Sequence, residues 1–179
     1  MSETIIGADA PLLTVRIYPD PVLRKTARPV TAADADEIRE LVPSMFATMY
    51  KAPGIGLAAT QVGKLLRVMV VDVAGQEEKP APLTLINPEL IAQSSETATQ
   101  QEGCLSIPDQ YADVTRPAKV KMRYLDMQGA KQEIEAEGLL SACLQHELDH
   151  LNGVLFVDYL SALKRNMLLR KLAKALKER

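Results

Sequence analysis

The sequence has few of the residues that usually build metal sites and aromatic cores: two histidines, two cysteines, two phenylalanines and no tryptophan among 179 residues. It also lacks any apolar run near the roughly 18 residues that a membrane-spanning helix needs. The N-terminus has no basic region followed by an apolar segment, so a secretory signal is not expected. Without export, Cys104 and Cys143 are expected to stay reduced in a cytoplasmic setting. A net charge of −2 gives no overall preference for DNA or a membrane surface.

What is present describes an ordinary folded domain. Hydrophobic residues make up 47% of the chain and charged residues 25%, which is typical of a soluble globular protein. A chain of this length buries roughly two thirds of its unfolded surface without disulfides. We therefore expect residues 1–179 to form a single domain.

Apolar side chains that recur every three or four residues predict helices, and short β-rich runs predict strands. Asp34 and Glu37 resemble a capping box at the first helix, and Pro43 should kink that helix or mark its start. The expected helices begin near residue 31 or 34 and end near 50, then span about 139–151 and 161–177. The expected strands span 67–72, 83–87, 89–94, 118–125 and 131–135, with 126–129 as a hairpin turn and 154–159 as a short strand or turn. The prediction is an α+β fold in which antiparallel or mixed sheets wrap a central helix, flanked by N-terminal and C-terminal helices.

Both histidines lie in one stretch, Gln145–His150, which reads QHELDH. On a helix, His146 and His150 fall on one face a single turn apart, so their imidazoles can bind one metal ion. Glu147, beside the first histidine, is then placed to act as a general base. The motif alone is also compatible with a polar turn on a helix surface.

A catalytic metal site of this kind needs a third protein ligand. Cys143 is seven residues from His150, a rise of about 10.5 Å along a helix. Metal–sulfur and metal–nitrogen bonds are only about 2.0–2.3 Å long, so Cys143 is expected to be a buried apolar residue instead. Cys104 is the best remaining ligand, placed in an irregular segment between strands and followed by Pro108.

Two other classes of protein fit the motif less well. A metzincin protease needs a third histidine at the position of Phe156, and a thermolysin-like peptidase has only Glu178 downstream as a candidate ligand. A purely structural metal site closes all four positions, but no convincing fourth ligand is present. A structural metal site would also give Glu147 no role.

Three separated motifs resemble the signatures of bacterial peptide deformylase: GIGLAATQ at Gly54–Gln61, EGCLS at Glu102–Ser106 and QHELDH at Gln145–His150. They stand in the family's order, and the likeness extends from Tyr18 to Phe156. The resemblance implies hydrolytic removal of the formyl group from the formylmethionine of nascent polypeptides, which releases formate. A deformylase-like protein with another substrate preference is the alternative.

The resemblance also implies a role for each site residue. One divalent ion, iron(II) with zinc, nickel or cobalt as alternatives, would be held by Cys104, His146 and His150. A metal-bound water would attack the formyl carbon, with Glu147 as the base that accepts its proton and the acid that returns it to the amine. The side-chain amide of Gln61 and the backbone N–H of Leu105 would stabilise the oxyanion.

Substrate contacts follow from the same resemblance. The peptide backbone would pair with Ile55, Gly56 and Gly103, and the methionine pocket would be built from Leu139, Ala142 and Cys143. Asp149 is expected to form an ion pair with Arg116 that orients the helix. Tyr111 and Ala142 depart from the family pattern, where an arginine and a branched residue are frequent.

The last expected element is strongly basic. Residues 161–179 hold seven lysines and arginines against Glu178 alone, whereas the rest of the chain is acidic. An apolar face of Leu168, Leu169, Leu172, Ala173 and Leu176 lies opposite the basic one. The helix is either a solvated surface element or, as the family resemblance implies, a contact with the ribosome.

Overall fold

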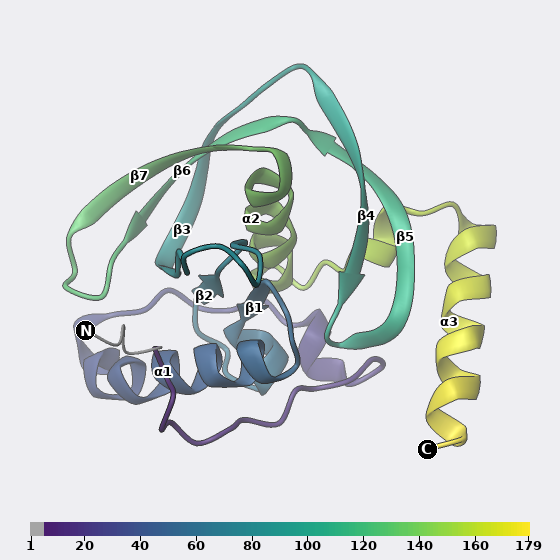
Figure 1. Cartoon of the computed structure of the whole chain (residues 1–179), viewed down its shortest axis with the longest axis horizontal. Helices are drawn as coiled ribbons and strands as arrows, with labels where there is room; N and C mark the ends of the chain where they lie inside the picture. Colours follow the sequence, from purple (N-terminus) through teal and green to yellow (C-terminus); the bar gives the residue numbers. More distant parts are fainter. Residues whose placement is uncertain (1–5) are drawn as a thin grey trace.

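A computed structural model describes residues 6–179 of the chain. Its long helices are α1 (Ala35–Lys51), α2 (Gly138–Leu151) and α3 (Ala162–Lys177). Figure 1 shows α2 in the centre of the molecule, with strands curving around it, α1 below and α3 at one edge. This arrangement confirms the α+β prediction of sheets wrapped around the helix that carries the two histidines.

The strands form two separate antiparallel sheets. The larger has the order β1-β2-β3-β6-β7, with bounds Gly56–Ala58, Val68–Val71, Leu83–Gln93, Lys119–Leu125 and Lys131–Glu137. The smaller is a two-stranded ribbon of β4 (Thr97–Cys104) and β5 (Ile107–Pro117). Short 3-10 helices η1 to η4 occupy Pro21–Arg24, Ala32–Asp34, Ala59–Val62 and Phe156–Tyr159.

Helix α1 covers one side of the larger sheet with the apolar face that the sequence indicates. Its buried side chains are Ile38, Leu41, Val42, Met45, Phe46 and Met49. They pack against Leu57, Val68 and Val70 on β1 and β2. This burial makes α1 the platform from which β1 and the loop before it reach the centre of the molecule.

Helix α2 is enclosed on most sides, which is why its sequence shows no clean polar face. Leu144 and Leu151 pack against Met69 and Met122 of the larger sheet. His146 and His150 instead contact Glu102 and Cys104 of β4. Even so, none of the helices within residues 6–179 is long and apolar enough to cross a membrane.

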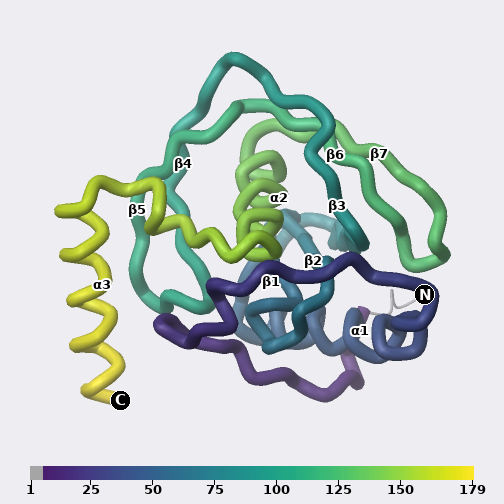
Figure 2. Tube along the Cα trace, turned by 180° about the vertical axis from the view of Figure 1, so that it is seen from behind, coloured from purple at the N-terminus to yellow at the C-terminus, as the bar shows by residue number. Residues whose placement is uncertain are grey.

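Helix α3 lies at the edge of the molecule beside β5, as both views show (Figures 1 and 2). Leu168 and Leu172 are buried against Val114 of β5 and Phe156 of η4. The predicted apolar face is therefore correct in outline, but Ala173 is exposed. The lysines of α3 are exposed to solvent.

The ribbon of β4 and β5 was largely missed from the sequence. Its strands are rich in glutamine, threonine and charged residues, because much of the ribbon faces solvent and only single positions such as Val114 are buried. Cys104 is the last residue of β4, whereas the sequence predicted an irregular segment at this position. A register shift between Gly103 and Cys104 breaks the ladder there, and such bulges re-aim side chains.

The structure decides three smaller expectations. The two strands expected at 83–87 and 89–94 are one strand, β3 (Leu83–Gln93), with a register shift between Ile86 and Glu89. Of the two alternatives expected at 154–159, a short strand or a turn, the structure has the turn, because residues 156–159 form a short 3-10 helix. Helix α1 continues through Pro43. The Asp34 carboxylate, just before the helix, accepts a hydrogen bond from the backbone amide of Thr31 (N to Oδ2, 2.8 Å) and forms no capping box with Glu37.

We expect Gly153→Ala to destabilise the fold far more than Gly129→Ala. Both glycines have left-handed φ angles, +74° and +78°, which cost an alanine about 1–2 kcal/mol. A Cβ at Gly153 would also lie 2.5 Å from the carbonyl oxygen of Arg24, whereas one at Gly129 meets nothing within 4 Å. Urea denaturation should show a loss of about 3 kcal/mol or more for Gly153→Ala and about 1 kcal/mol for Gly129→Ala. Equal losses would contradict the clash.

Candidate metal centre and substrate pocket

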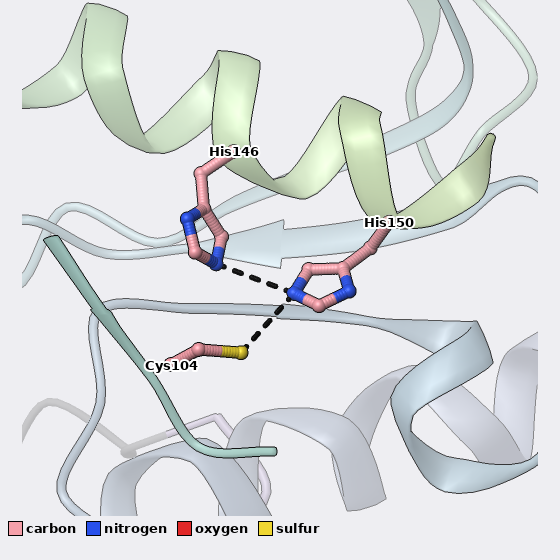
Figure 3. Close-up of side chains that lie close together, drawn as sticks. All are labelled: Cys104, His146 and His150. Carbon is pink, nitrogen blue, oxygen red and sulfur yellow. Dashed lines mark hydrogen bonds between the residues drawn. The ribbon is translucent and has the colours of Figure 1, made fainter. Parts of the chain in front are cut away.

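The side chains of Cys104, His146 and His150 converge between α2 and the end of β4 (Figure 3). Cys104 Sγ lies 3.3 Å from His150 Nε2, and the two Nε2 atoms are 3.2 Å apart. All three donor atoms lie within 4.8 Å of one another. The helical spacing places the histidines, and the end of β4 brings the thiol to them from 42 residues upstream of His146 in the sequence.

This donor set fits a divalent metal ion. One thiol and two imidazoles suit ions of intermediate softness, such as zinc, iron(II), cobalt(II) or nickel(II). The other ring nitrogen of His146, Nδ1, is 2.9 Å from Glu102 Oε1, which leaves Nε2 free to face the centre. A carboxylate behind a histidine in this way is the usual arrangement around metal ligands.

Glu102 in turn belongs to a buried charge network. Arg116 donates to it through Nε and Nη2, at 2.7 and 2.9 Å, and through Nη1 to Asp149 Oδ2 at 2.8 Å. Tyr159 also donates to Asp149, and the Arg116 guanidinium lies 4.6 Å from the Tyr159 ring centroid. The expected ion pair of Asp149 with Arg116 is thus present, and it joins β5 to α2.

The network keeps its charges ionised despite burial. Burial alone would raise the pKa of Glu102, but hydrogen bonds from Arg116 and His146 lower it overall. Burial likewise disfavours the Arg116 cation, and its bonds to Glu102 and Asp149 raise its pKa in spite of that. A fixed anion therefore stands behind His146.

The pKa values of the two histidines are shifted in opposite directions. Burial lowers the pKa of both, yet hydrogen bonds to Cys104 and Glu102 raise that of His146, whereas the neighbouring His146 and Arg116 lower that of His150 still further. A metal ligand must be a neutral imidazole, so a cation at this centre would compete with the proton on His146.

Glu147 is buried beside the centre. Burial is the main reason that its pKa rises to about 7. Its Oε1 atom is 4.0 Å from His146 Nε2, and its Oε2 atom has no hydrogen-bond partner among residues 6–179. A Cβ placed on Gly56 would lie 2.7 Å from Glu147 Oε1, so only glycine leaves room for the carboxylate.

Gln61 reaches the same centre from η3. Its Oε1 atom accepts from the Ala58 amide at 2.9 Å, which fixes the amide group so that Nε2 points the other way. Nε2 donates to Ser106 Oγ at 3.1 Å and lies 3.5 Å from Cys104 Sγ. The neighbouring Leu105 lines the same space.

A pocket of about 710 Å³ opens onto this centre. It is lined by nearly every residue that the sequence pointed to: Ile55, Gly56, Gln61, Gly103, Cys104, Leu105, Leu139, Ala142, Cys143, His146 and Glu147. His150 is almost fully buried behind them. Cys143 is buried, and burial raises the pKa of its thiol, which agrees with the expectation of an apolar role.

Sequence reasoning missed the parts played by Glu102, Ser106 and Tyr159. Glu102 and Ser106 flank Cys104 within the second motif, so the motif held the signal, but nothing in their spacing says that one faces His146 and the other Gln61. Nothing in the sequence indicates a role for Tyr159, because its contact with Arg116 forms only in the folded chain.

Comparison with known proteins decides the family. A family model described as polypeptide deformylase matches residues 12–166. The chain belongs to the polypeptide deformylase family. The peptide deformylase of Mesorhizobium japonicum is 53% identical, with 94% of this chain and 96% of the relative covered. That of Rhizobium meliloti is 55% identical, with 91% and 93% covered.

Solved structures agree with the fold. A peptide deformylase from Legionella pneumophila superposes with a TM-score of 0.87 at 44% identity, covering 93% of this chain and 96% of that one. One from Synechococcus elongatus, in complex with actinonin, gives 0.86 at 43% identity, covering 96% and 94%. The family predicted from the motifs is confirmed, and the chain is an enzyme of the peptide deformylase kind.

We expect Glu102→Gln to weaken metal binding at the deformylase centre. The variant keeps the size of the side chain but removes the anion behind His146, and such outer partners change metal affinity about 10- to 100-fold. Titration of the metal-free protein with cobalt(II), followed through the thiolate charge-transfer absorption, measures this affinity. Glu133→Gln, in an exposed pair with Arg123, is the control. Equal affinities for the two variants would contradict the role of Glu102.

Proposed function

We propose that this deformylase removes the formyl group from the N-terminal formylmethionine of new polypeptides, giving formate and a free amine. The observation that carries the proposal is the convergence of Cys104, His146 and His150 beside the buried Glu147, inside a pocket lined by the predicted substrate contacts. A metal centre, a base and a groove for a chain end are the parts that amide hydrolysis of this kind requires.

The metal would be held by Cys104 Sγ and the Nε2 atoms of His146 and His150. When bound, a divalent ion supplies Lewis acidity and lowers the pKa of a coordinated water. Iron(II) is the proposed ion, with zinc, nickel and cobalt as alternatives, since all accept this donor set.

Glu147 would handle the proton. With a pKa of about 7, its carboxylate can accept a proton from the attacking water near neutral pH and hold it as a carboxylic acid. The water oxygen forms a bond to the formyl carbon as that proton leaves. When the carbon–nitrogen bond breaks, the departing nitrogen takes the proton back from Glu147, which restores the carboxylate and leaves formic acid, which then ionises to formate.

Gln61 and Leu105 would stabilise the charge that develops on the formyl oxygen. Gln61 is held at its carbonyl end by Ala58, so its N–H groups are preorganised toward the Cys104 side of the pocket. A backbone N–H from Leu105 would supply the second donor. Donors fixed before the reaction are worth about 10²–10³ in rate each.

The peptide would lie along the pocket walls. The backbone of Ile55, Gly56 and Gly103 would pair with it like an added strand. Leu139, Ala142 and Cys143 would surround the methionine side chain. The closeness of Gly56 to Glu147 supports this placement, because a backbone without a side chain lets substrate approach the base.

Helix α3 would attach the enzyme to the ribosome. Its exposed lysines form a basic surface at the edge of the molecule, away from the packed Leu168 and Leu172. Such a surface suits the phosphates of ribosomal RNA.

Glu147→Ala should abolish formate release from a formyl-Met peptide. Loss of the proton carrier is expected to lower kcat about 10²–10⁴-fold. Wild type and variant are compared with iron(II) bound, and Glu137→Ala, which removes an exposed carboxylate, should match wild type. No release by wild type would refute the proposed reaction, and equal rates would refute the role of Glu147. Formyl peptides with other first residues test for a different substrate preference.

Replacing the exposed Lys171, Lys174 and Lys177 by glutamine should weaken ribosome binding without loss of small-peptide turnover. Each lost phosphate contact reduces the slope of log affinity against log salt by about 0.7–0.9. Sedimentation with ribosomes at several salt concentrations measures both quantities. Lys25, Lys51 and Lys131, exposed elsewhere, give the matched triple control. An unchanged affinity and slope would rule out α3 as the contact.

A further inference from the structure

One wall of the pocket is the short segment of residues 52–56, here called the wall segment. At its start it is tied to α1, because the amides of Ala52 and Gly54 donate to the carbonyls of Thr48 and Met49 at 3.2 and 2.7 Å. The wall segment therefore begins as an extension of the helix.

At its other end the wall segment is tied to β2. The amide of Asp72 donates to the carbonyl of Ile55 at 2.9 Å, and Gly56 pairs with Val71 in the sheet. The same Ile55 carbonyl lies 3.6 Å from the thiol of Cys143 on α2. Its backbone is thus held between the sheet and the helix that carries the histidines.

A side-chain hydrogen bond joins the two attachments to each other. The hydroxyl of Tyr50, at the end of α1, donates to Asp72 Oδ2 at 2.6 Å. The other oxygen of this buried carboxylate accepts from the amides of Ala74 and Ala81, at 3.0 and 3.2 Å. Burial and the Asp72 carboxylate raise the pKa of Tyr50, so the phenol keeps the proton that it donates.

We propose that Tyr50 and Asp72 are positioning residues for substrate: their hydrogen bond sets the place of the wall segment, and through Ile55 and Gly56 it sets how tightly the formyl peptide binds. This inference rests on the proposed peptide contacts of Ile55 and Gly56.

The wall segment packs closely against α2. A Cβ at Gly56 would come within 2.7 Å of Glu147 and 2.8 Å of Cys143 Sγ. Neither Tyr50 nor Asp72 lines the pocket, so any effect of theirs on substrate must pass through the backbone that they hold. A shift of the wall segment changes contacts made equally in the bound and transition states, which alters KM more than kcat.

The test is the kinetics of Tyr50→Phe with iron(II) bound, on a formyl-Met peptide. The variant keeps the ring, stacked on Phe46 at 5.9 Å between centroids, and removes only the hydroxyl. We expect KM to rise about fivefold to tenfold, which lies within the range for the loss of one ordinary hydrogen bond, with kcat within about twofold of wild type. Hydrogen exchange at the Asp72 amide, which is bonded to Ile55, should accelerate.

Two variants of Asp72 separate positioning from general stability. Asp72→Asn retains an oxygen for the two backbone amides and gains an N–H that can donate to the Tyr50 oxygen, so KM should stay near wild type. Asp72→Ala should match Tyr50→Phe. Asp34→Ala removes a buried carboxylate bonded to Arg28 at the other end of α1, and should lower the melting temperature without raising KM.

An unchanged KM in Tyr50→Phe, or an equal rise in Asp34→Ala, would overturn the inference. Failure of the proposed reaction is distinguishable, because wild type would then release no formate. Failure of the proposed contacts is distinguishable as well, because wild type would then show the same KM for a formyl-Met peptide and for an analogue in which an ester oxygen replaces the backbone N–H that follows methionine.

Discussion

The candidate metal centre depends above all on the ion pairs that the buried guanidinium of Arg116 forms. This guanidinium stands on β5, binds Glu102 on β4 with two hydrogen bonds and binds Asp149 on α2 with a third. Within residues 6–179, the ribbon of β4 and β5 pairs with no strand of the larger sheet, so contacts other than strand pairing must hold it against α2. Arg116 fixes the ribbon to α2, and Cys104 at the end of β4 is thereby held against the two histidines. Removing one partner from such a buried group costs about 3–5 kcal/mol, because the remaining charges lose their compensation.

The same network also contacts one of the proposed metal ligands. Glu102 is shared between Arg116 and His146, so the residue that anchors the ribbon also orients a proposed metal ligand. Glu147, the residue after His146 on α2, is buried, and burial outweighs the nearby His146 and Arg116 and raises its pKa to about 7. The pKa of Glu102 is therefore lowered, whereas that of Glu147 is raised. One stays an anion that orients His146, and the other is suited to exchange a proton near neutral pH.

Features that depend on local residue spacing could be predicted from the sequence, whereas features that depend on contacts between distant segments could not. The i, i+4 spacing of His146 and His150 is a property of any helix, so the pair was evident before the fold was known. The apolar face of α1 was evident for the same reason. The ribbon at residues 97–117 was not, because a two-stranded, solvent-facing element lacks the hydrophobic alternation of a half-buried strand. The roles of Glu102, Ser106 and Tyr159 were missed because their partners are distant in sequence.

By itself, the sequence determined the α+β class, the helix that carries two histidines one turn apart with a glutamate beside the first, and, through three motifs in order, the deformylase family. Geometry along one helix was also enough to reject Cys143 as a ligand. Only the tertiary structure decided how the thiol of Cys104 meets Nε2 of His146 and His150, which carboxylate is ionised, and which residues hold the pocket wall in place. The physical reason is that helical spacing is set by local backbone geometry, whereas ribbon attachment, burial and the resulting proton affinities depend on contacts between segments that are far apart in the chain.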